Sequence, residues 1–355
     1  MTSNPEKSSG APNPPNQASP EPASAPNNPE EHQPLEVDDI TSDTDSTFSD
    51  RSSTAQSASI TSSILNYEYS NGRRYHGYQR GSYVLPNDEK EQDRLDLLHH
   101  IFLLLLDGKL IRAPIGSDPQ RVLDVGTGTG LWAIDFADEY PSAQIVGTDL
   151  SPIQPSWIPP NVKFYVDDAE NEWVYGPDEA FDFIYSRNMA GGIKDWDRYI
   201  GQAFQHTKPG GWLELIEFEA LVTSDDDSKN RVPYVDQFQT KCNEAAAKFG
   251  KKIDQAPNHK QRVINAGYVD VRSDVFKVPI GTWPKDKKLK EVGRYFVEHM
   301  MMGVEAYSLG FLGKVLGWSK DECRVLISKT NAELRDRKNN LYVRLHIVYG
   351  RKPSA

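Results

Sequence analysis

The chain has 355 residues and a formal net charge of -11, and it contains no long cluster of Lys and Arg. This composition disfavours direct binding to DNA or RNA, which requires a basic surface. The longest run of aliphatic and aromatic residues, Ile101 to Leu106, is far too short to span a bilayer, and the polar N-terminus lacks the apolar core of a secretory signal. We therefore expect an intracellular, cytoplasmic protein without a membrane association.

Cys242 and Cys323 are the two cysteines of the chain, and they form neither a CxxC pair nor another spacing typical of a metal site. Free thiols in a reducing compartment are the expectation for such cysteines. We predict no metal and assign the cysteines no chemistry.

Residues 1–63 are rich in Pro, Ser, Asn, Thr and Glu, and Phe48 is their only aromatic residue. Such a segment cannot bury enough apolar surface to offset the entropy lost on ordering, so we predict a disordered tail. Its stretch from Glu36 to Asp50 is acidic and hydroxyl-rich. This stretch suits a solvated spacer or, alternatively, a phosphorylated segment that binds a protein partner.

Order is expected to begin near Ile64, where an N-terminal capping segment over 64–114 starts. Pro86-Asn87-Asp88 predicts the entry of a helix with acids in its first turn. Apolar residues then recur at three- and four-residue steps, which predicts an amphipathic helix lying against a sheet. These residues are Leu95, Leu98, Ile101, Phe102, Leu105 and Leu106.

The stretch from Arg121 to Gly130, RVLDVGTGTG, predicts a buried strand that enters a tight glycine loop. Helical spacing follows from Leu131 to Glu139, so loop N–H groups lie at a helix N-terminus, where an anionic or polar ligand can bind. Glycine suits this loop because it tolerates positive φ and lets a ligand approach the backbone. The next predicted strand, Gln144 to Asp149, ends on a carboxylate that is well placed to accept both hydroxyls of a ribose.

Strand and helix signals alternate beyond this point, which predicts an α/β fold with a mostly parallel sheet covered on both faces. Further strands are expected at 162–166, 181–186, 212–218, 268–278 and 340–349, and further helices at 195–205, 233–266, 289–309 and 320–337. The late strands suggest a reversed strand at one edge of the sheet. The whole domain is expected to span 64–353, with a helical insertion on the substrate side at 233–337.

Three nucleotide-binding motifs compete for the glycine loop. A dinucleotide fingerprint would need glycine where Leu131 stands, and a phosphate-binding P-loop would need a G-K-[ST] sequence that is missing. The observed G-x-G-x-G, with Asp124 before it and Asp149 after it, suits a nucleoside that carries methionine in place of pyrophosphate. A nicotinamide oxidoreductase is therefore the weaker alternative.

The segment Val122 to Gly130 resembles motif I of the class I methyltransferases that use S-adenosylmethionine (SAM), and four further segments resemble motifs of this family in the same order. They are Gly147–Ser151 (acidic loop), Val162–Ala169 (adenine-binding segment), Phe181–Asn188 (motif IV) and Lys208–Glu214 (the loop before the fifth strand). The resemblance implies SAM as the cofactor and a class I Rossmann-like fold with a seven-stranded sheet.

The same resemblance implies roles for single residues of these motifs. Asp149 would bind the ribose, Asp168 would face the exocyclic amine of adenine, and Ala169 would lie beside the ring. The cofactor-binding residues that we expect are Asp124, Gly126, Thr127, Gly128, Gly130, Asp149, Leu150, Asp168, Ala169, Arg187 and Asn188.

Methyl transfer is an in-line displacement at a sulfonium, and positioning can supply about 7–11 kcal/mol of the acceleration. A base is therefore optional, although it would help with a hydroxyl acceptor. Glu217 and His206 are candidates, because they fall near the end of the fifth strand and in the helix before it. The alternative for Glu217 is a strand-end acid bonded to a neighbouring turn, and for His206 a cap at its helix C-terminus.

Aromatic residues and methionines gather in the helical region, where they suit either an apolar acceptor pocket or ordinary core packing. They are Tyr295, Phe296, Met300, Met301, Met302, Tyr307 and Phe311.

A narrower resemblance, over about residues 64 to 353, is to the fungal LaeA-like methyltransferases. It rests on Tyr83–Leu95, Leu316–Ser319 and Val348–Pro353. It implies a methyltransferase that acts on a small molecule of fungal secondary metabolism. The alternative is a regulatory methyltransferase that assembles with velvet-type protein partners in the nucleus, with the N-terminal tail as a binding segment.

Overall fold

The computed structural model describes residues 66–354, and the predicted tail over 1–63 lies outside them. The strands are β1 (Glu68–Ser70), β2 (Arg73–Tyr75), β3 (Arg121–Val125), β4 (Gln144–Asp149), β5 (Val162–Val166), β6 (Phe181–Arg187), β7 (Thr207–Thr223), β8 (Val269–Ile280) and β9 (Leu341–Arg351). The α-helices are α1 (Glu89–Leu105), α2 (Leu131–Glu139), α3 (Trp196–His206), α4 (Pro233–Phe249), α5 (His259–Asn265), α6 (Lys287–Tyr307) and α7 (Lys320–Arg335). Short helical turns are η2 (Pro177–Glu179), η3 (Asp227–Arg231) and η4 (Ala256–Asn258), and a π-helical segment, η5 (Ser308–Val315), continues α6.

Seven strands form one sheet in the order β5-β4-β3-β6-β7-β9-β8. The strands from β5 to β7 pair in parallel, whereas β9 runs antiparallel to both of its neighbours. This confirms the predicted mostly parallel α/β sheet. The reversed strand lies next to the edge strand β8.

The chain reverses its direction of travel across the sheet at β3. It moves outward from β3 through β4 to β5, and then returns to place β6 on the other side of β3. In an open parallel sheet, ligands bind outside the carboxyl ends of the strands at such a point. The topology therefore places a binding crevice beside the loop that follows β3.

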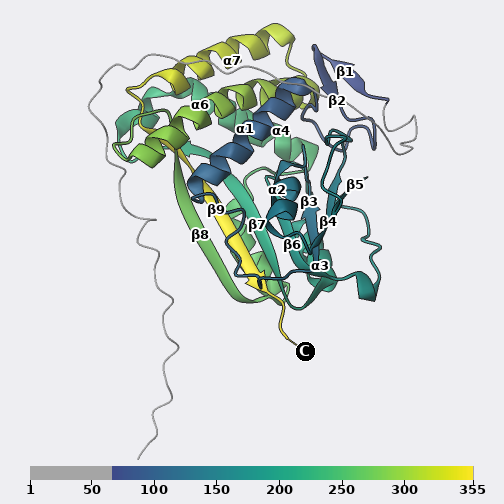
Figure 1. Ribbon diagram of the computed structural model, residues 1–355. Helices are drawn as coiled ribbons and strands as arrows, with labels where there is room; N and C mark the ends of the chain where they lie inside the picture. Colours follow the sequence, from purple (N-terminus) through teal and green to yellow (C-terminus); the bar gives the residue numbers. More distant parts are fainter. Residues whose placement is uncertain (1–65, 355) are drawn as a thin grey trace, which may run out of the picture.

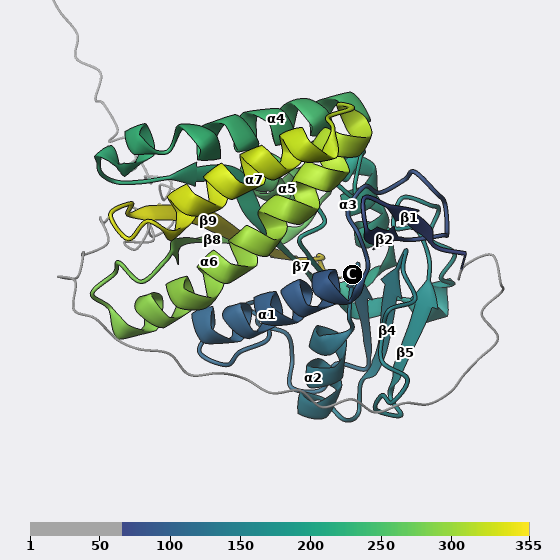
Figure 2. The same ribbon diagram turned by 90° about the horizontal axis from the view of Figure 1, so that it is seen from above.

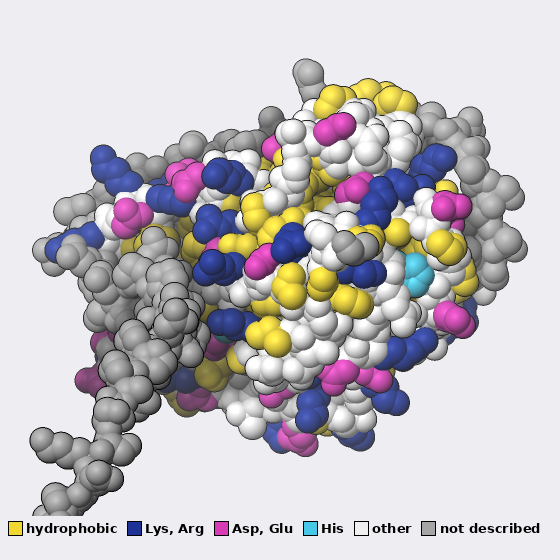
Figure 3. Space-filling model, turned by 90° about the horizontal axis from the view of Figure 1, so that it is seen from below, with side chains coloured by type: hydrophobic (Ala, Val, Ile, Leu, Met, Phe, Trp, Pro, Cys, Tyr) yellow, Lys and Arg dark blue, Asp and Glu magenta, His cyan; other side chains and the backbone are white. Residues whose placement is uncertain are grey.

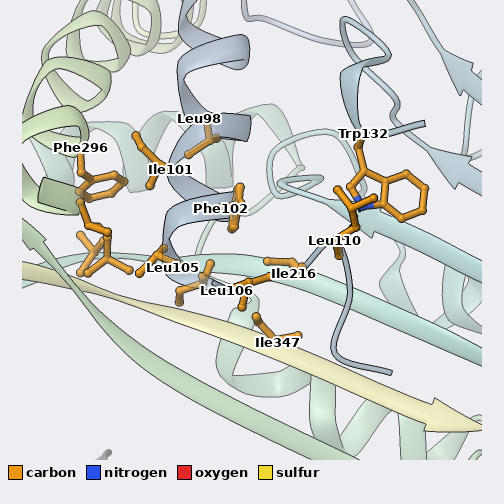
Figure 4. Packing of buried hydrophobic residues seen from close by; sticks show 14 of the residues in the cluster. Leu98, Ile101, Phe102, Leu105, Leu106, Leu110, Trp132, Ile216, Phe296 and Ile347 are labelled. Atoms are coloured by element: carbon orange, nitrogen blue, oxygen red, sulfur yellow. Dashed lines mark hydrogen bonds between the residues drawn. The ribbon is translucent and has the colours of Figure 1, made fainter. Parts of the chain in front are cut away.

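Helices cover both faces of the sheet. On one face, α1 and α2 pack on the sheet, with Phe102 and Leu105 of α1 on the side of the helix that faces Ile216 and Ile347 (Figure 4). On the other face, α3 and α5 pack together over β7, in a buried cluster that includes Tyr199, Ile200, Ala203, Val263 and Leu213. Burial of these apolar side chains is the main favourable contribution to the fold.

The helices α4, α6 and α7 lie together at the end of the sheet toward which the parallel strands point (Figures 1 and 2). A third buried cluster joins α4, η5 and α7 to the segment before α1, through residues such as Val84, Cys242, Leu312 and Leu326. These helices thus roof the carboxyl ends of the strands.

Some boundaries differ from the predictions for local reasons. The helix expected over 233–266 ends at Phe249, because Gly250 adopts a left-handed φ of 87° that closes the helix. The strand β7 continues past the expected 218, because β9 pairs with it as far as Thr223. The β1–β2 hairpin was not expected, and Asn71 and Gly72 form its turn, both with positive φ.

The surface seen in Figure 3 mixes Lys and Arg with Asp, Glu and hydrophobic side chains, without one large basic patch on that face. None of the helices within residues 66–354 combines the length and the apolar character needed to cross a membrane.

Candidate functional site

A cavity of about 300 Å³ lies between the carboxyl ends of the parallel strands and the roofing helices. Part of its lining comes from residues 126–129, 131, 148–151, 153, 167–169 and 187–188, and we call this part the loop half. The other part, which we call the inner chamber, is lined by α1, by the end of β7, by α4 and α6, by Thr330 and Leu334 of α7, and by Val343 of β9. A ligand at the strand ends and a second ligand under the helices would therefore share one space.

The glycine loop after β3 is fixed by hydrogen bonds to its surroundings. The N–H groups of Gly126 and Thr127 donate to the carbonyl oxygen of Thr148, at 2.8 and 2.9 Å. The Thr127 hydroxyl donates to Oδ2 of Asp124 at 2.6 Å. Burial raises the pKa of Asp124 to about 7, and the bond from Thr127 opposes this shift.

Two of the loop glycines allow close packing of neighbouring side chains, and Gly126 also lines the cavity. A Cβ on Gly126 would lie 2.1 Å from the sulfur of Met189, and one on Gly130 would lie 2.5 Å from the ring of Phe164. Gly130 and Asp124 are not among the residues that line the cavity. The structure shows that both residues shape the loop, and their contact with the cofactor stays a prediction.

Asp149 and Gly128 meet at the wall of the loop half. The carboxylate of Asp149 accepts hydrogen bonds from the N–H groups of Gly128 and Ser151, both at 2.9 Å. Burial raises the pKa of Asp149, and these bonds lower it. A Cβ on Gly128 would meet only Leu95, at 3.5 Å, so the backbone here faces open space. The arrangement fits a nucleoside, which needs a carboxylate for its ribose and a bare backbone beside it.

Other expected cofactor residues also line the loop half: Thr127, Leu150, Asp168, Ala169, Arg187 and Asn188. Asp168 is buried, and its Oδ1 accepts a hydrogen bond from the N–H of Glu170 at 2.9 Å. The N–H of Asn188 donates to Ile216, and its φ is 56°. The structure thus brings together in one wall most residues that the sequence singled out.

Arg187 contributes a positive charge to this wall. Its guanidinium lies 4.7 Å from the ring centroid of Phe102, and its two terminal nitrogens lie 3.4 Å from Nδ1 of His99. Nε2 of His99 lies 2.8 Å from Asp135. Burial lowers the pKa of His99, the bond to Asp135 raises it, and Arg187 lowers it further. A neutral His99 can therefore accept from Arg187 while it donates to Asp135.

Glu217 lies in the cavity wall and also holds the loop that follows β6. Its carboxylate accepts from the N–H groups of Met189 and Ala190. Burial raises its pKa to about 8, and these two bonds oppose the shift. Glu217 is thus a strand-end acid bonded to a neighbouring turn, as the alternative interpretation held. Its carboxylate also faces the cavity.

His206 lies elsewhere. It is the last residue of α3, its Nδ1 is 2.9 Å from the carbonyl oxygen of Gln202, and its ring packs against Trp173 and Tyr175. Because β7 begins at the next residue, His206 lies at the amino end of that strand, whereas the cavity lies at the carboxyl ends. We therefore do not retain His206 as a candidate base.

A buried ion pair in the cavity wall was not foreseen. Glu91 and Arg94 pair at 2.6 Å, and Nη1 of Arg94 lies 3.2 Å from Nε2 of His299. Burial lowers the pKa of His299 well below its usual value, and the charge of Arg94 adds to the shift. Glu91 and Arg94 lie on the same face of α1 as Leu98, where apolar residues are expected. The two charged residues on this apolar face were the sequence signal that could have indicated the ion pair.

Some of the aromatic and methionine residues of the helical region line the cavity, and the others do not. Phe296, Met300 and Tyr307 line the cavity. The remaining four do not: Tyr295, Met301, Met302 and Phe311. Among the described residues, no group of His, Cys, Asp or Glu is arranged to hold a metal ion, and both cysteines are buried free thiols.

Comparison with known proteins gives several matches. Residues 97–250 match the family model described as "Methyltransferase domain". Methyltransferase pytC of Aspergillus terreus is 42% identical over 83% of this chain and 91% of its own length. The secondary metabolism regulator LAE1 of Cochliobolus heterostrophus is 36% identical over 80% of this chain and 94% of its own. The regulator laeA of Aspergillus fumigatus is 34% identical over 80% and 76%, respectively.

Proposed function

We propose that the chain methylates a small molecule of secondary metabolism that binds in the inner chamber. The premise is that the chain belongs to the fungal LaeA-like family of SAM-dependent methyltransferases. The observation that carries this proposal is the continuity of the cavity. The same space is lined by the Asp149 carboxylate at one end and by apolar side chains of α4 and α6 at the other. A methyl donor and an acceptor bound there would be neighbours.

In the loop half, Asp149 would bind the ribose hydroxyls, and the bare backbone of Gly128 would lie beside the nucleoside. Leu150 and Ala169 would flank the adenine, with Asp168 near its amine. Arg187 is the residue that we assign to the carboxylate of SAM. Among the described residues, no carboxylate forms a salt bridge with it, and charge-assisted hydrogen bonds of this kind are strong.

SAM supplies an electrophilic methyl group on a sulfonium. The chain's own contribution is to hold the acceptor in line with the methyl group and to exclude water. Positioning alone can supply much of the rate acceleration. Glu217 is the carboxylate in the wall whose pKa, about 8, suits proton acceptance near neutral pH. We propose that Glu217 accepts the proton of a hydroxyl acceptor, in addition to holding the loop at 189–190 through its hydrogen bonds.

Two measurements test this function. Calorimetry should detect binding of SAM and of S-adenosylhomocysteine, and incubation with labelled SAM and an organic extract of a fungal culture should label a small molecule. Absence of cofactor binding, or label found only on protein, would contradict the proposal.

The names of several relatives favour a second role, because LAE1 and laeA are described as regulators of secondary metabolism. In this role the chain would bind protein partners, with the tail over 1–63 as a binding segment. A comparison of metabolites after loss of the gene separates the two roles. Loss of one methyl group indicates the biosynthetic enzyme, whereas changes in many pathways indicate the regulator.

A further inference from the structure

We infer that the methyl acceptor is an elongated, uncharged and mostly apolar molecule, and that Gln239 binds an oxygen atom on it away from the reacting end. This inference rests on the proposed function and specifies the acceptor that the inner chamber fits. Three features of the chamber carry it: its length, its charge and one side-chain amide.

The length follows from the unequal ends of neighbouring strands. The last residue of β6, Arg187, pairs with Ile216, and β7 then continues to Thr223 with β9 as its remaining partner. The residues from Glu217 to Val222 all line the cavity. A strand rises about 3.3 Å per residue, so this floor extends roughly 15 Å beyond the ends of the parallel strands. The bulge between Phe218 and Val222 shortens it somewhat.

The chamber offers no free charge within residues 66–354. Its charged side chains are paired or held: Glu91 with Arg94, Glu219 with His346 at 2.7 Å, and Glu217 with two backbone N–H groups. The rest of the lining is mostly apolar, including Val235, Phe238, Phe296, Met300 and Val304. A charged acceptor would lose its hydration here without gaining a partner, which is costly.

Gln239 interrupts the apolar lining. It lies on α4 between Val235 and Cys242, which both line the cavity, and it is itself 9% exposed. Its Nε2 is buried and has no hydrogen-bond partner within the described part of the chain. An unsatisfied buried donor is unfavourable, and leucine of similar size would avoid the loss. Polar groups of this kind persist where a ligand completes them. Because Nε2 donates, the completing atom is an acceptor such as a carbonyl, ether or hydroxyl oxygen.

The neutral dye Nile red is a suitable probe, because it is elongated and apolar and carries a carbonyl oxygen at one end. Its fluorescence would be titrated with the full chain in the presence of S-adenosylhomocysteine, whose own binding is measured by calorimetry. We expect saturable binding, about fivefold weaker in Gln239→Leu, which is the loss of one ordinary hydrogen bond. Gln237→Leu, a change on the exposed face of the same helix, should bind as the wild type does.

A second variant locates the probe. Gly303 lines the chamber, and a Cβ there would meet nothing within 4 Å. The Cβ of a substituted residue therefore has room, and we expect Gly303→Phe to fill the chamber and to abolish Nile red binding while S-adenosylhomocysteine still binds. Persistence of the signal in this variant would overturn the assignment of the chamber.

Stability separates recognition from a structural role. If the Nε2 of Gln239 gains a hydrogen-bond partner only when a ligand binds, Gln239→Leu should melt at the same or a higher temperature than the ligand-free wild type. A lower melting temperature, or Nile red binding unchanged by the substitution, would overturn the inference, as would equally tight binding of the anionic dye 1-anilinonaphthalene-8-sulfonate in the chamber. Failure of the wild type to bind S-adenosylhomocysteine would instead count against the proposed function.

Discussion

The backbone N–H of Gly128 donates a hydrogen bond of 2.9 Å to the carboxylate of Asp149, 21 residues further along the chain. The bond ties the loop after β3 to the end of the neighbouring strand β4. A second bond, from the N–H of Ser151, fixes the other carboxylate oxygen. The acid is thus already oriented toward the cavity before a cofactor binds, which reduces the entropy lost on binding.

Replacement of this acid should weaken cofactor binding. Asp149→Ala removes charge-assisted hydrogen bonds worth roughly 1.5–3 kcal/mol, so we expect a ten- to hundredfold higher Kd for SAM by calorimetry. Asp138→Ala, which changes an exposed acid on α2, is the matched control and should leave the Kd unchanged. Equal affinities for the wild type and Asp149→Ala would refute the ribose assignment.

Two glycine substitutions should have opposite effects on stability. Gly128 has a φ of 58°, and alanine there costs about 1–2 kcal/mol, so Gly128→Ala should melt at a lower temperature and bind SAM more weakly. Gly201 lies within α3 with open space around its Cβ position. Gly201→Ala should gain about 0.5–1 kcal/mol. Thermal melts of both variants check this, and a stabilised Gly128→Ala would show that the loop does not require its left-handed conformation.

Glu217 should matter to the rate more than to cofactor affinity. Glu217→Gln keeps an oxygen that can accept from Met189 but removes the proton acceptor, so we expect kcat with a hydroxyl acceptor to fall about a hundredfold or more. The wild-type rate should rise with pH up to about 8, where the carboxyl ionises, and the variant should lack this rise. A variant with the wild-type pH profile would assign Glu217 to holding the loop alone.

Three buried carboxyl groups should each lower stability as the pH rises from about 4.5 to 8, whereas the buried His259 and His299, whose pKa values burial lowers, act in the opposite direction up to about pH 6.5. Burial raises the pKa of Glu214 to about 7, so the unfolded chain loses this proton at a lower pH than the folded protein does. Asp124 and Glu217 act in the same direction. Ionisation of the unfolded state thus favours unfolding progressively through this window.

The variant Glu214→Gln tests one of these groups away from the cavity. Oε2 of Glu214 accepts from the backbone N–H groups of Arg112 and Ala113, and its Oε1 is buried without a partner among the described residues. We expect the variant to match the wild type near pH 4.5 and to exceed it at pH 8 by roughly 1–3 kcal/mol. Melts at both pH values measure this. A variant that is less stable at pH 8 would show that the ionised carboxylate is preferred in the fold.

The sequence predicted best the elements whose signals are local. The bounds of β3, α2, β4 and β5 agree with those expected, because short buried apolar runs end there at glycines or acids. The pairing of β7 with β9, in contrast, depends on partners more than a hundred residues apart, and it decides where β7 ends.

The sequence pointed to most of the loop half and, in the chamber, to Glu217, Phe296, Met300 and Tyr307, but it did not point to Gln239 or Arg94. Asp149 and Gly128 follow strand ends, where periodicity and topology together imply a crevice. Gln239 and Arg94 lie on helices. The helical periodicity indicates that these polar residues interrupt an apolar face, but it does not indicate that a cavity lies there. His206 illustrates a different limit. A helix that precedes a parallel strand ends at the strand's amino edge, so nearness in sequence to β7 placed it at the wrong end of the sheet.

The position of β9 between β7 and β8 has a consequence for biosynthesis. A ribosome produces β7 and β8 long before it produces Leu341–Arg351, so both strands must wait with an unpaired edge. Leu345 and Ile347 of this late strand are also fully buried in the main core. The sheet can close only after β9 has been synthesised, and until then the unpaired edges of β7 and β8 expose the nascent protein to aggregation and to binding by chaperones.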